Sequence, residues 1–218
     1  MNYTTRKPQK QNSSSPPTLI ILHGYGADEF DLLPVASGLD PSLLAISIQA
    51  PIELPWGGYA WYHLEQTPTG LKSDSKSRIE SEDLLITTLP EIIAIEGGDP
   101  NHVFLMGFSQ GAAMCYSLIG RHDLSEEGIH IRAVIALSGY IPEDVIEPLS
   151  QIDLSDIPFF LSHGIHDDLI PPVAMQKAKG ILEKAGAQIL AKEYETGHGL
   201  TEQTVSDLRE WMQAVVSR

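Results

Sequence analysis

The chain has 218 residues, of which 42% are hydrophobic and 20% charged, a composition typical of one ordinary globular domain. Its formal net charge of −15 at pH 7 argues against binding to nucleic acid or anionic lipid, since both need clustered Lys and Arg. Cys115 is the only cysteine, so no intrachain disulfide can form and we expect a cytoplasmic protein.

Residues 1–16 begin the chain with a stretch rich in Ser, Gln, Lys and Pro. This composition predicts a flexible N-terminal leader, followed by a single domain over residues 17–218. The leader has no apolar segment, so we do not read it as a secretory signal. No run in the chain approaches ~18 consecutive apolar residues, which predicts that the protein does not insert stably into a membrane.

Six short apolar runs follow the leader and are predicted to be strands. They are nearly continuous instead of alternating, which is typical of parallel strands covered on both faces. The runs span residues 18–24, 43–51, 102–108, 131–139, 158–164 and 188–197.

Helical periodicity appears between these runs and after the last one. Apolar residues recur at helical spacing over residues 79–95, 174–185 and 205–216, and Gly186 is expected just beyond the end of the second helix. Pro90 should kink or split the first helix because it lacks a backbone N–H. Alternating strands and helices predict an α/β three-layer sandwich with a mostly parallel sheet, whose functional residues gather at the carboxyl ends of the strands.

The stretch "GFSQG" places Ser109 between two glycines, after a predicted strand and before a predicted helix. This context is typical of a serine nucleophile on a sharp strand-to-helix turn. A serine hydroxyl needs a base, and on this fold the chain order is serine, then acid, then histidine. His198, in "YETGHGL", is the only histidine that lies after the later candidate acids at positions 167 and 168, so we expect it to be the base.

The acid is less well determined by the residues themselves. Asp167 and Asp168 both follow the predicted strand at 158–164, and neighbouring side chains point in different directions, so only one can face His198. The sequence alone prefers neither. Glu143 and Asp144, after the preceding strand, are weaker candidates.

An oxyanion hole for such a serine needs two backbone donors. One is expected to be the N–H of Gln110, the residue after the nucleophile. The other should come from the loop "HGYGADEFD" after the first apolar run, where the N–H of Tyr25 is the best candidate.

Several segments together resemble the phospholipase/carboxylesterase family of α/β-hydrolases, which includes acyl-protein thioesterases. They are "LHGYGADEFDLLP", "QAPIELPWGGYAWYHL", "MGFSQGAAM", "ALSGYIP", "HGIHDDLIPP" and "YETGHGLTEQTVSDLREWM", in the family's order and spacing. The resemblance implies a triad of Ser109, Asp167 and His198, with Asp167 chosen over its neighbour. It also implies Tyr25 and Gln110 as the oxyanion donors.

The same resemblance implies that Trp61 and Leu169 line an acyl groove, although Trp61 is equally consistent with a packing role. It is also the basis for expecting a homodimer. The chain has no room for a large lid domain, so residues 63–77 are expected to cover the site only as a loop.

Two other classes of function compete with this interpretation. The first is a metal hydrolase, because four residues that can bind a metal are clustered: His163, His166, Asp167 and Asp168. No metal-ligand spacing such as H-E-x-x-H occurs, however, so we predict no metal and no cofactor. A hydrolase fold can also serve as a non-catalytic protein that binds a small molecule or a partner.

We therefore predict a serine carboxylic-ester hydrolase that acts through an acyl-enzyme on esters with small to medium acyl groups. Thioesterase activity on an acylated protein, or lysophospholipase activity, is the alternative within the same chemistry.

Overall fold

The structure is a computed structural model and describes residues 1–10, 15–67, 70–121 and 123–216. Seven strands form one sheet in the order β1-β3-β2-β8-β9-β10-β11, with only β1 antiparallel to its neighbour. The six predicted parallel strands are thereby confirmed. Their bounds are β2 Pro17–Leu22, β3 Leu44–Ile48, β8 Asp99–Phe108, β9 Ile131–Leu137, β10 Phe159–Gly164 and β11 Ile189–Tyr194.

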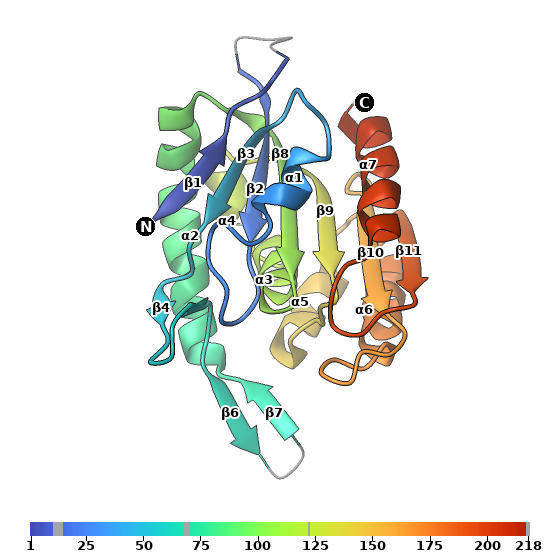
Figure 1. The fold of residues 1–218 in the computed structure, drawn as a ribbon. Coiled ribbons are helices and arrows are strands. Elements are labelled where there is room, and N and C mark those ends of the chain that lie inside the picture. The colour runs from blue at the N-terminus through green and yellow to red at the C-terminus, as the bar shows by residue number, and fades with distance from the viewer. Residues whose placement is uncertain (11–14, 68–69, 122, 217–218) are drawn as a thin grey trace.

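Helices cover both faces of this sheet, which makes the predicted three-layer sandwich (Figure 1). Strand β2 illustrates why both faces are apolar: Ile20 and Leu22 pack in one core cluster, and Leu19 and Ile21 in the other. The first cluster is closed by α2 Ser75–Glu96, α3 Gln110–Ile119, α5 Ile146–Gln151 and α6 Val173–Lys184; the second is closed by α1 Leu33–Ser37 and α7 Glu202–Val216. Two short helical elements flank β9 along the chain: α4 Asp123–Glu126 before it and the 3-10 turn η1 Glu143–Val145 after it.

Helix α2 runs without interruption through Pro90, so the expected split does not occur. An interior proline costs about 3 kcal/mol, whereas burying one Leu or Ile side chain gains about 1.5–3 kcal/mol. Five buried apolar side chains of α2, Leu85, Ile86, Leu89, Ile92 and Ile93, pack against the sheet. Their burial outweighs the missing hydrogen bond. At the end of α6, Gly186 has φ +89°, as predicted for the residue beyond the helix.

The expectation of a flexible N-terminal leader needs correction. Tyr3–Arg6 form strand β1, which pairs with β3 at the edge of the sheet. Glu96 of α2 holds this strand, since its carboxylate accepts the Tyr3 hydroxyl at 3.0 Å and pairs with Lys7 at 2.6 Å. Tertiary contacts thus order this polar segment; residues 11–14 of the predicted leader lie outside the described residues.

Two small hairpins occur between β3 and α2. The first pairs β4 Ile52–Glu53 with β5 Tyr59–Ala60, and the second pairs β6 Leu64–Thr67 with β7 Gly70–Ser73. The segment expected to be a loop is therefore a hairpin, which projects beyond the carboxyl ends of the parallel strands (Figure 1). Among the helices that the structure describes, none combines the length and apolarity that crossing a membrane requires.

Candidate active site

Ser109 lies on the sharp turn between β8 and α3, as the sequence predicts, with φ 54° and ψ −113°. Such a conformation is rare for a residue with a side chain and keeps its hydroxyl at the sheet edge. The flanking glycines are required sterically. A Cβ on Gly107 would lie 2.2 Å from the Gly111 carbonyl oxygen, and a Cβ on Gly111 would lie 2.0 Å from the Leu22 carbonyl oxygen.

His198 connects Ser109 to an aspartate through two hydrogen bonds. Its Nε2 lies 2.9 Å from Ser109 Oγ, and its Nδ1 lies 2.7 Å from Asp167 Oδ2. Three strands supply the three residues: Ser109 follows β8, Asp167 follows β10, and His198 lies between β11 and α7. Asp168 is exposed to solvent. The structure thus brings Asp167, and not its neighbour, to the imidazole.

The carboxylate of Asp167 is buried and fixed by backbone donors. Its Oδ1 accepts the N–H groups of Leu169 at 3.0 Å and Ile170 at 2.9 Å. His163 Nε2 lies 2.7 Å from the Ile170 carbonyl oxygen and 3.2 Å from Asp167 Oδ2. These contacts leave one orientation in which Oδ2 faces His198.

A pocket of about 590 Å³ opens directly over Ser109 and His198. Apolar side chains form most of its wall, including Leu64, Phe108, Leu169, Ile170, Pro171 and Ala174. Tyr62 and Tyr140 also line it, and their hydroxyls lie 2.8 Å apart. Burial raises the pKa of both phenols, so they are neutral at neutral pH. Leu64 brings the β6–β7 hairpin to this wall.

Both predicted oxyanion residues line the same pocket. Gln110 is the first residue of α3, whose N-terminal N–H groups and dipole favour negative charge. Tyr25 lies in the loop after β2, which packs tightly against the start of α3: a Cβ on Gly111 would also lie 2.7 Å from the His23 carbonyl oxygen. The two segments therefore meet beside Ser109.

Trp61 occupies a different position from the one that the resemblance implies. It is fully buried in the core and does not line the pocket; the adjacent Tyr62 does. The indole N–H of Trp61 donates to the His23 carbonyl at 2.9 Å, so Trp61 contacts the loop that carries Tyr25 from behind. Leu169, in contrast, lines the pocket at its rim and is 62% exposed.

The side chain of Gln110 has a structural role that the sequence does not reveal. Its amide oxygen accepts the backbone N–H of Trp61 at 2.7 Å, and its amide nitrogen donates to the backbone carbonyl of Tyr62 at 2.8 Å. Two serines of α2 hold the same segment, residues 61–63, which we call the strap. Ser77 accepts the backbone N–H of His63, and the Ser81 hydroxyl donates to the Trp61 carbonyl. No pattern of apolar residues signals such contacts, because each depends on segments that meet only in the fold.

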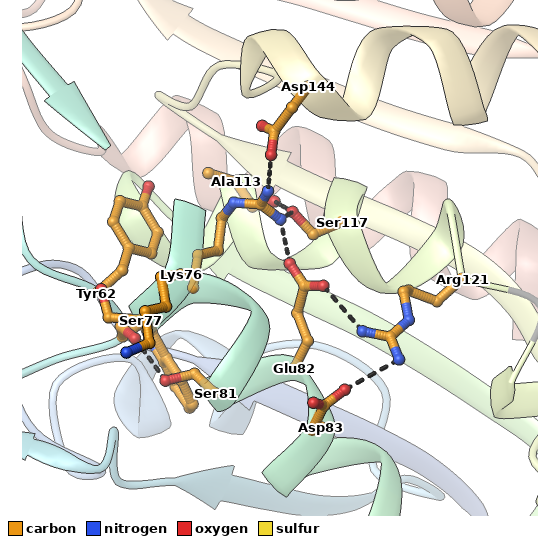
Figure 2. Close-up of polar contacts among 12 residues, drawn as sticks. Tyr62, Lys76, Ser77, Ser81, Glu82, Asp83, Ala113, Ser117, Arg121 and Asp144 are labelled. Carbon is orange, nitrogen blue, oxygen red and sulfur yellow. Dashed lines mark hydrogen bonds and ion pairs between the residues drawn. The ribbon is translucent and has the colours of Figure 1, made fainter. Parts of the chain in front are cut away.

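A buried network of charged and polar side chains joins α2 to α3 and to η1 (Figure 2). Arg78 pairs with Glu82, donates to Ser117 of α3 at 2.9 Å, and contacts Asp144 at 2.5 Å. Arg121 joins Glu82 from the other side at 3.4 Å. Burial raises the pKa of Glu82, while the two guanidinium groups oppose that shift.

The residues considered for a metal are divided among separate contacts. His166 lies at the surface beside Glu195, at 3.0 Å, whereas His163 contacts Asp167 and Ile170 in the interior. Within the part of the chain that the structure describes, no group of three or more His, Cys, Asp and Glu residues is arranged to hold a metal ion.

The chain is similar in sequence and in fold to several known proteins. The putative hydrolase MhqD of Bacillus subtilis (strain 168) is 24% identical over 216 residues, which cover 94% of this chain and 97% of that protein. The solved structure of YahD with malic acid is 25% identical, has a TM-score of 0.83, and matches 98% of each chain. The Bacillus cereus carboxylesterase, at 23% identity, has a TM-score of 0.82 over 99% of this chain and 94% of its own, which shows a shared fold.

The family model described as Phospholipase/Carboxylesterase matches residues 8–216, which is nearly the whole chain. Its span includes the turn at Ser109, the loop of Tyr25 and the segments that carry Asp167 and His198. The fold of the solved neighbours agrees with this match. The chain therefore belongs to the phospholipase/carboxylesterase family, a hydrolase family with the α/β fold described above.

Proposed function

We propose that the protein is a serine carboxylic-ester hydrolase that works through an acyl-enzyme. The observation that carries the proposal is the unbroken chain of hydrogen bonds from Ser109 through His198 to Asp167, opening into a mostly apolar pocket. The three residues have the mutual geometry that nucleophilic catalysis requires.

In this mechanism His198 Nε2 takes the proton of Ser109 as its oxygen attacks the acyl carbonyl carbon. Asp167 holds the imidazole in the tautomer whose Nδ1 carries a proton, and stabilises the imidazolium that forms. The N–H groups of Tyr25 and Gln110 stabilise the oxyanion. The imidazolium then protonates the leaving alcohol, and a water activated by His198 hydrolyses the acyl-enzyme.

The pocket supports acyl groups of small to medium size. Its volume of about 590 Å³ lies within the ~300–1,000 Å³ of typical small-molecule sites. Its apolar wall favours an alkyl or aryl group over a charged one. The same chemistry can cleave a thioester or the oxygen ester of a lipid, so thioesterase activity on an acylated protein, or lysophospholipase activity, is the alternative to a small-molecule ester.

The test compares wild-type protein with Ser109→Ala on a ladder of p-nitrophenyl esters from acetate to decanoate, with matched thioesters in parallel. We expect Ser109→Ala to abolish turnover of every substrate while its circular dichroism spectrum stays that of the wild type. Activity in wild type should peak at short to medium chains. Retained turnover in Ser109→Ala would reject the mechanism, and a folded wild type inert to all esters would favour a non-catalytic binding protein.

A further inference from the structure

His23 lies fully buried directly before the loop that carries the oxyanion donor Tyr25. Its ring makes two hydrogen bonds to the backbone. The Ala50 N–H donates to Nε2 at 3.0 Å, and Nδ1 lies 2.7 Å from the Gly24 carbonyl oxygen. Because Nε2 accepts a hydrogen bond, it carries no proton, so a neutral ring must carry its proton on Nδ1 and donate it to Gly24.

This contact has a geometric consequence for the next residue. The Gly24 carbonyl and the Tyr25 N–H belong to the same planar trans peptide, in which C=O and N–H point in opposite directions. With the carbonyl held against the buried ring of His23, the Tyr25 N–H points to the other side of the loop. The Ala27 N–H also reaches the Gly24 carbonyl, at 3.3 Å, which keeps the same orientation.

Two further observations place this loop beside the reacting centre. Gly24 and Tyr25 line the pocket together with Ser109. A Cβ on Gly24 would lie 3.0 Å from the ring of Phe108, the residue before the serine. Behind the loop, Trp61 donates to the carbonyl of His23 itself, at 2.9 Å, so two successive carbonyls are held toward the interior.

We propose that His23 is a positioning residue for the oxyanion hole: its Nδ1–H fixes the Gly24 carbonyl and thereby aims the Tyr25 N–H at the oxyanion, with Trp61 supporting the loop from behind. The inference rests on the proposed esterase function. It assigns His23 no contact with substrate, and it gives buried Trp61 a role through the loop instead of through the acyl groove.

Both hydrogen bonds can form only while the ring is neutral. Protonation would turn Nε2 into a donor that faces the Ala50 N–H, and the hydrogen bond would be lost. Burial lowers the pKa of His23 below its ordinary value, and the nearby carboxylates of Asp28, Glu29 and Asp31 oppose this only in part. The site therefore keeps one tautomer at neutral pH.

A matched pair of variants separates the two hydrogen bonds. His23→Asn places an amide N–H where Nδ1 stands and keeps the donor to Gly24, but loses the acceptor for Ala50. His23→Gln places an amide oxygen near Nε2 and keeps the Ala50 contact, but loses the donor to Gly24. We expect His23→Gln to lower kcat by about 10²-fold with little change in KM. His23→Asn should retain most of the wild-type kcat.

The second readout is inhibition by an alkyl trifluoromethyl ketone. The Ser109 oxygen adds to the ketone carbon, its proton passes to His198, and the carbonyl oxygen becomes an oxyanion that needs the same donors. The affinity of the trifluoromethyl ketone should fall in His23→Gln by the same factor as kcat. The affinity of the corresponding methyl ketone should not fall, because that ketone largely does not form the adduct with Ser109. Equal losses in both His23 variants, or unchanged inhibition in His23→Gln, would overturn the proposal.

Trp61→Phe decides the question if His23→Gln does not fold. It keeps an aromatic ring in the core and removes the indole N–H that holds the His23 carbonyl, together with part of the ring volume. We expect a fall in kcat and in trifluoromethyl ketone affinity without a matching rise in KM; no fall in either would overturn the proposal. Failure of the esterase function itself would look different, since the wild type would then show no hydrolysis that depends on Ser109.

Discussion

The side-chain carbonyl of Gln110 accepts the backbone N–H of Trp61 at 2.7 Å, directly beneath the pocket. The residue after the proposed nucleophile therefore holds the strap whose next residue, Tyr62, forms part of the pocket wall. One side chain thus joins three parts of the site that are far apart in sequence: the turn at Ser109, the pocket wall and, through the indole of Trp61, the loop of Tyr25.

Replacing this amide should cost stability and activity together. Gln110→Met has nearly the same shape but leaves the Trp61 N–H and the Tyr62 carbonyl buried without partners, at about 1–3 kcal/mol for each group. We expect a lower urea midpoint and a lower kcat/KM. Gln203→Met, at an exposed position of α7, is the matched control and should change the free energy of unfolding by less than about 0.5 kcal/mol. Equal stability of the two variants would contradict this role.

Asp167 and Asp168 offer a comparison between neighbours. Asp167→Asn removes the carboxylate that holds the Nδ1–H tautomer of His198, and we expect kcat to fall by about 10⁴-fold. Asp168→Asn changes an exposed side chain and should leave kcat close to that of the wild type. Steady-state kinetics on p-nitrophenyl butyrate measure both. A larger loss in Asp168→Asn would show that the wrong acid has been chosen.

The buried ion pair of Arg78 and Glu82 should affect the stability of the fold more than the catalytic chemistry. Arg78→Met leaves the buried Glu82 carboxylate with Arg121 as its remaining cation and Ser117 as a hydrogen-bond partner, and we expect a loss of about 3–5 kcal/mol in the free energy of unfolding. Changing both residues, as Arg78→Met with Glu82→Gln, should recover part of it because no buried charge remains.

The loss of stability in Arg78→Met should depend on pH with a defined sign. Burial already raises the pKa of Glu82 in the folded protein, and loss of Arg78 removes a group that opposes the shift. A raised folded pKa means that stability is present at low pH and is lost as pH rises through that pKa. Urea unfolding of Arg78→Met should therefore show a smaller penalty at about pH 5 than at about pH 7. A penalty that is equal at both values would contradict the assignment.

His23 should affect stability with the opposite sign. Because its folded pKa is lowered from the ordinary 6.5, the unfolded chain binds a proton first as the pH falls. The wild type should lose stability between about pH 6.5 and pH 5 more steeply than His23→Gln, which has nothing to titrate there. Thermal unfolding of both proteins over this range measures the difference; parallel curves would mean that burial of His23 has no such cost.

The six parallel strands and the residues at their ends were predictable from the sequence, for one physical reason. Strands buried on both faces must be continuously apolar, as in "TLIILHG", and the polar residues that interrupt such runs mark the carboxyl edge. Ser109 and His198 stand at such edges. The choice of Asp167 over Asp168 was not contained in the pattern, because it depends on which side chain a turn buries.

Other features could not be read from local sequence. Strand β1, "YTTR", is polar and short, and it is ordered by pairing with β3 and by the distant Glu96. Trp61 has the same local pattern whether it faces a groove or the core; only the carbonyl of His23 and the amide of Gln110, met in the fold, decide it. Pro90 opposes helix formation locally, and tertiary burial of α2 overrides it.

The central claim is that Ser109 attacks an electrophile with the help of His198 and Asp167. Labelling with a fluorophosphonate probe, followed by peptide mapping, tests it most directly because the adduct marks the attacking atom itself. The account predicts one adduct, on Ser109, in the folded wild type, slower labelling in Asp167→Asn, and none in Ser109→Ala. Folded wild-type protein that takes up no probe, or labelling that survives Ser109→Ala, would contradict it.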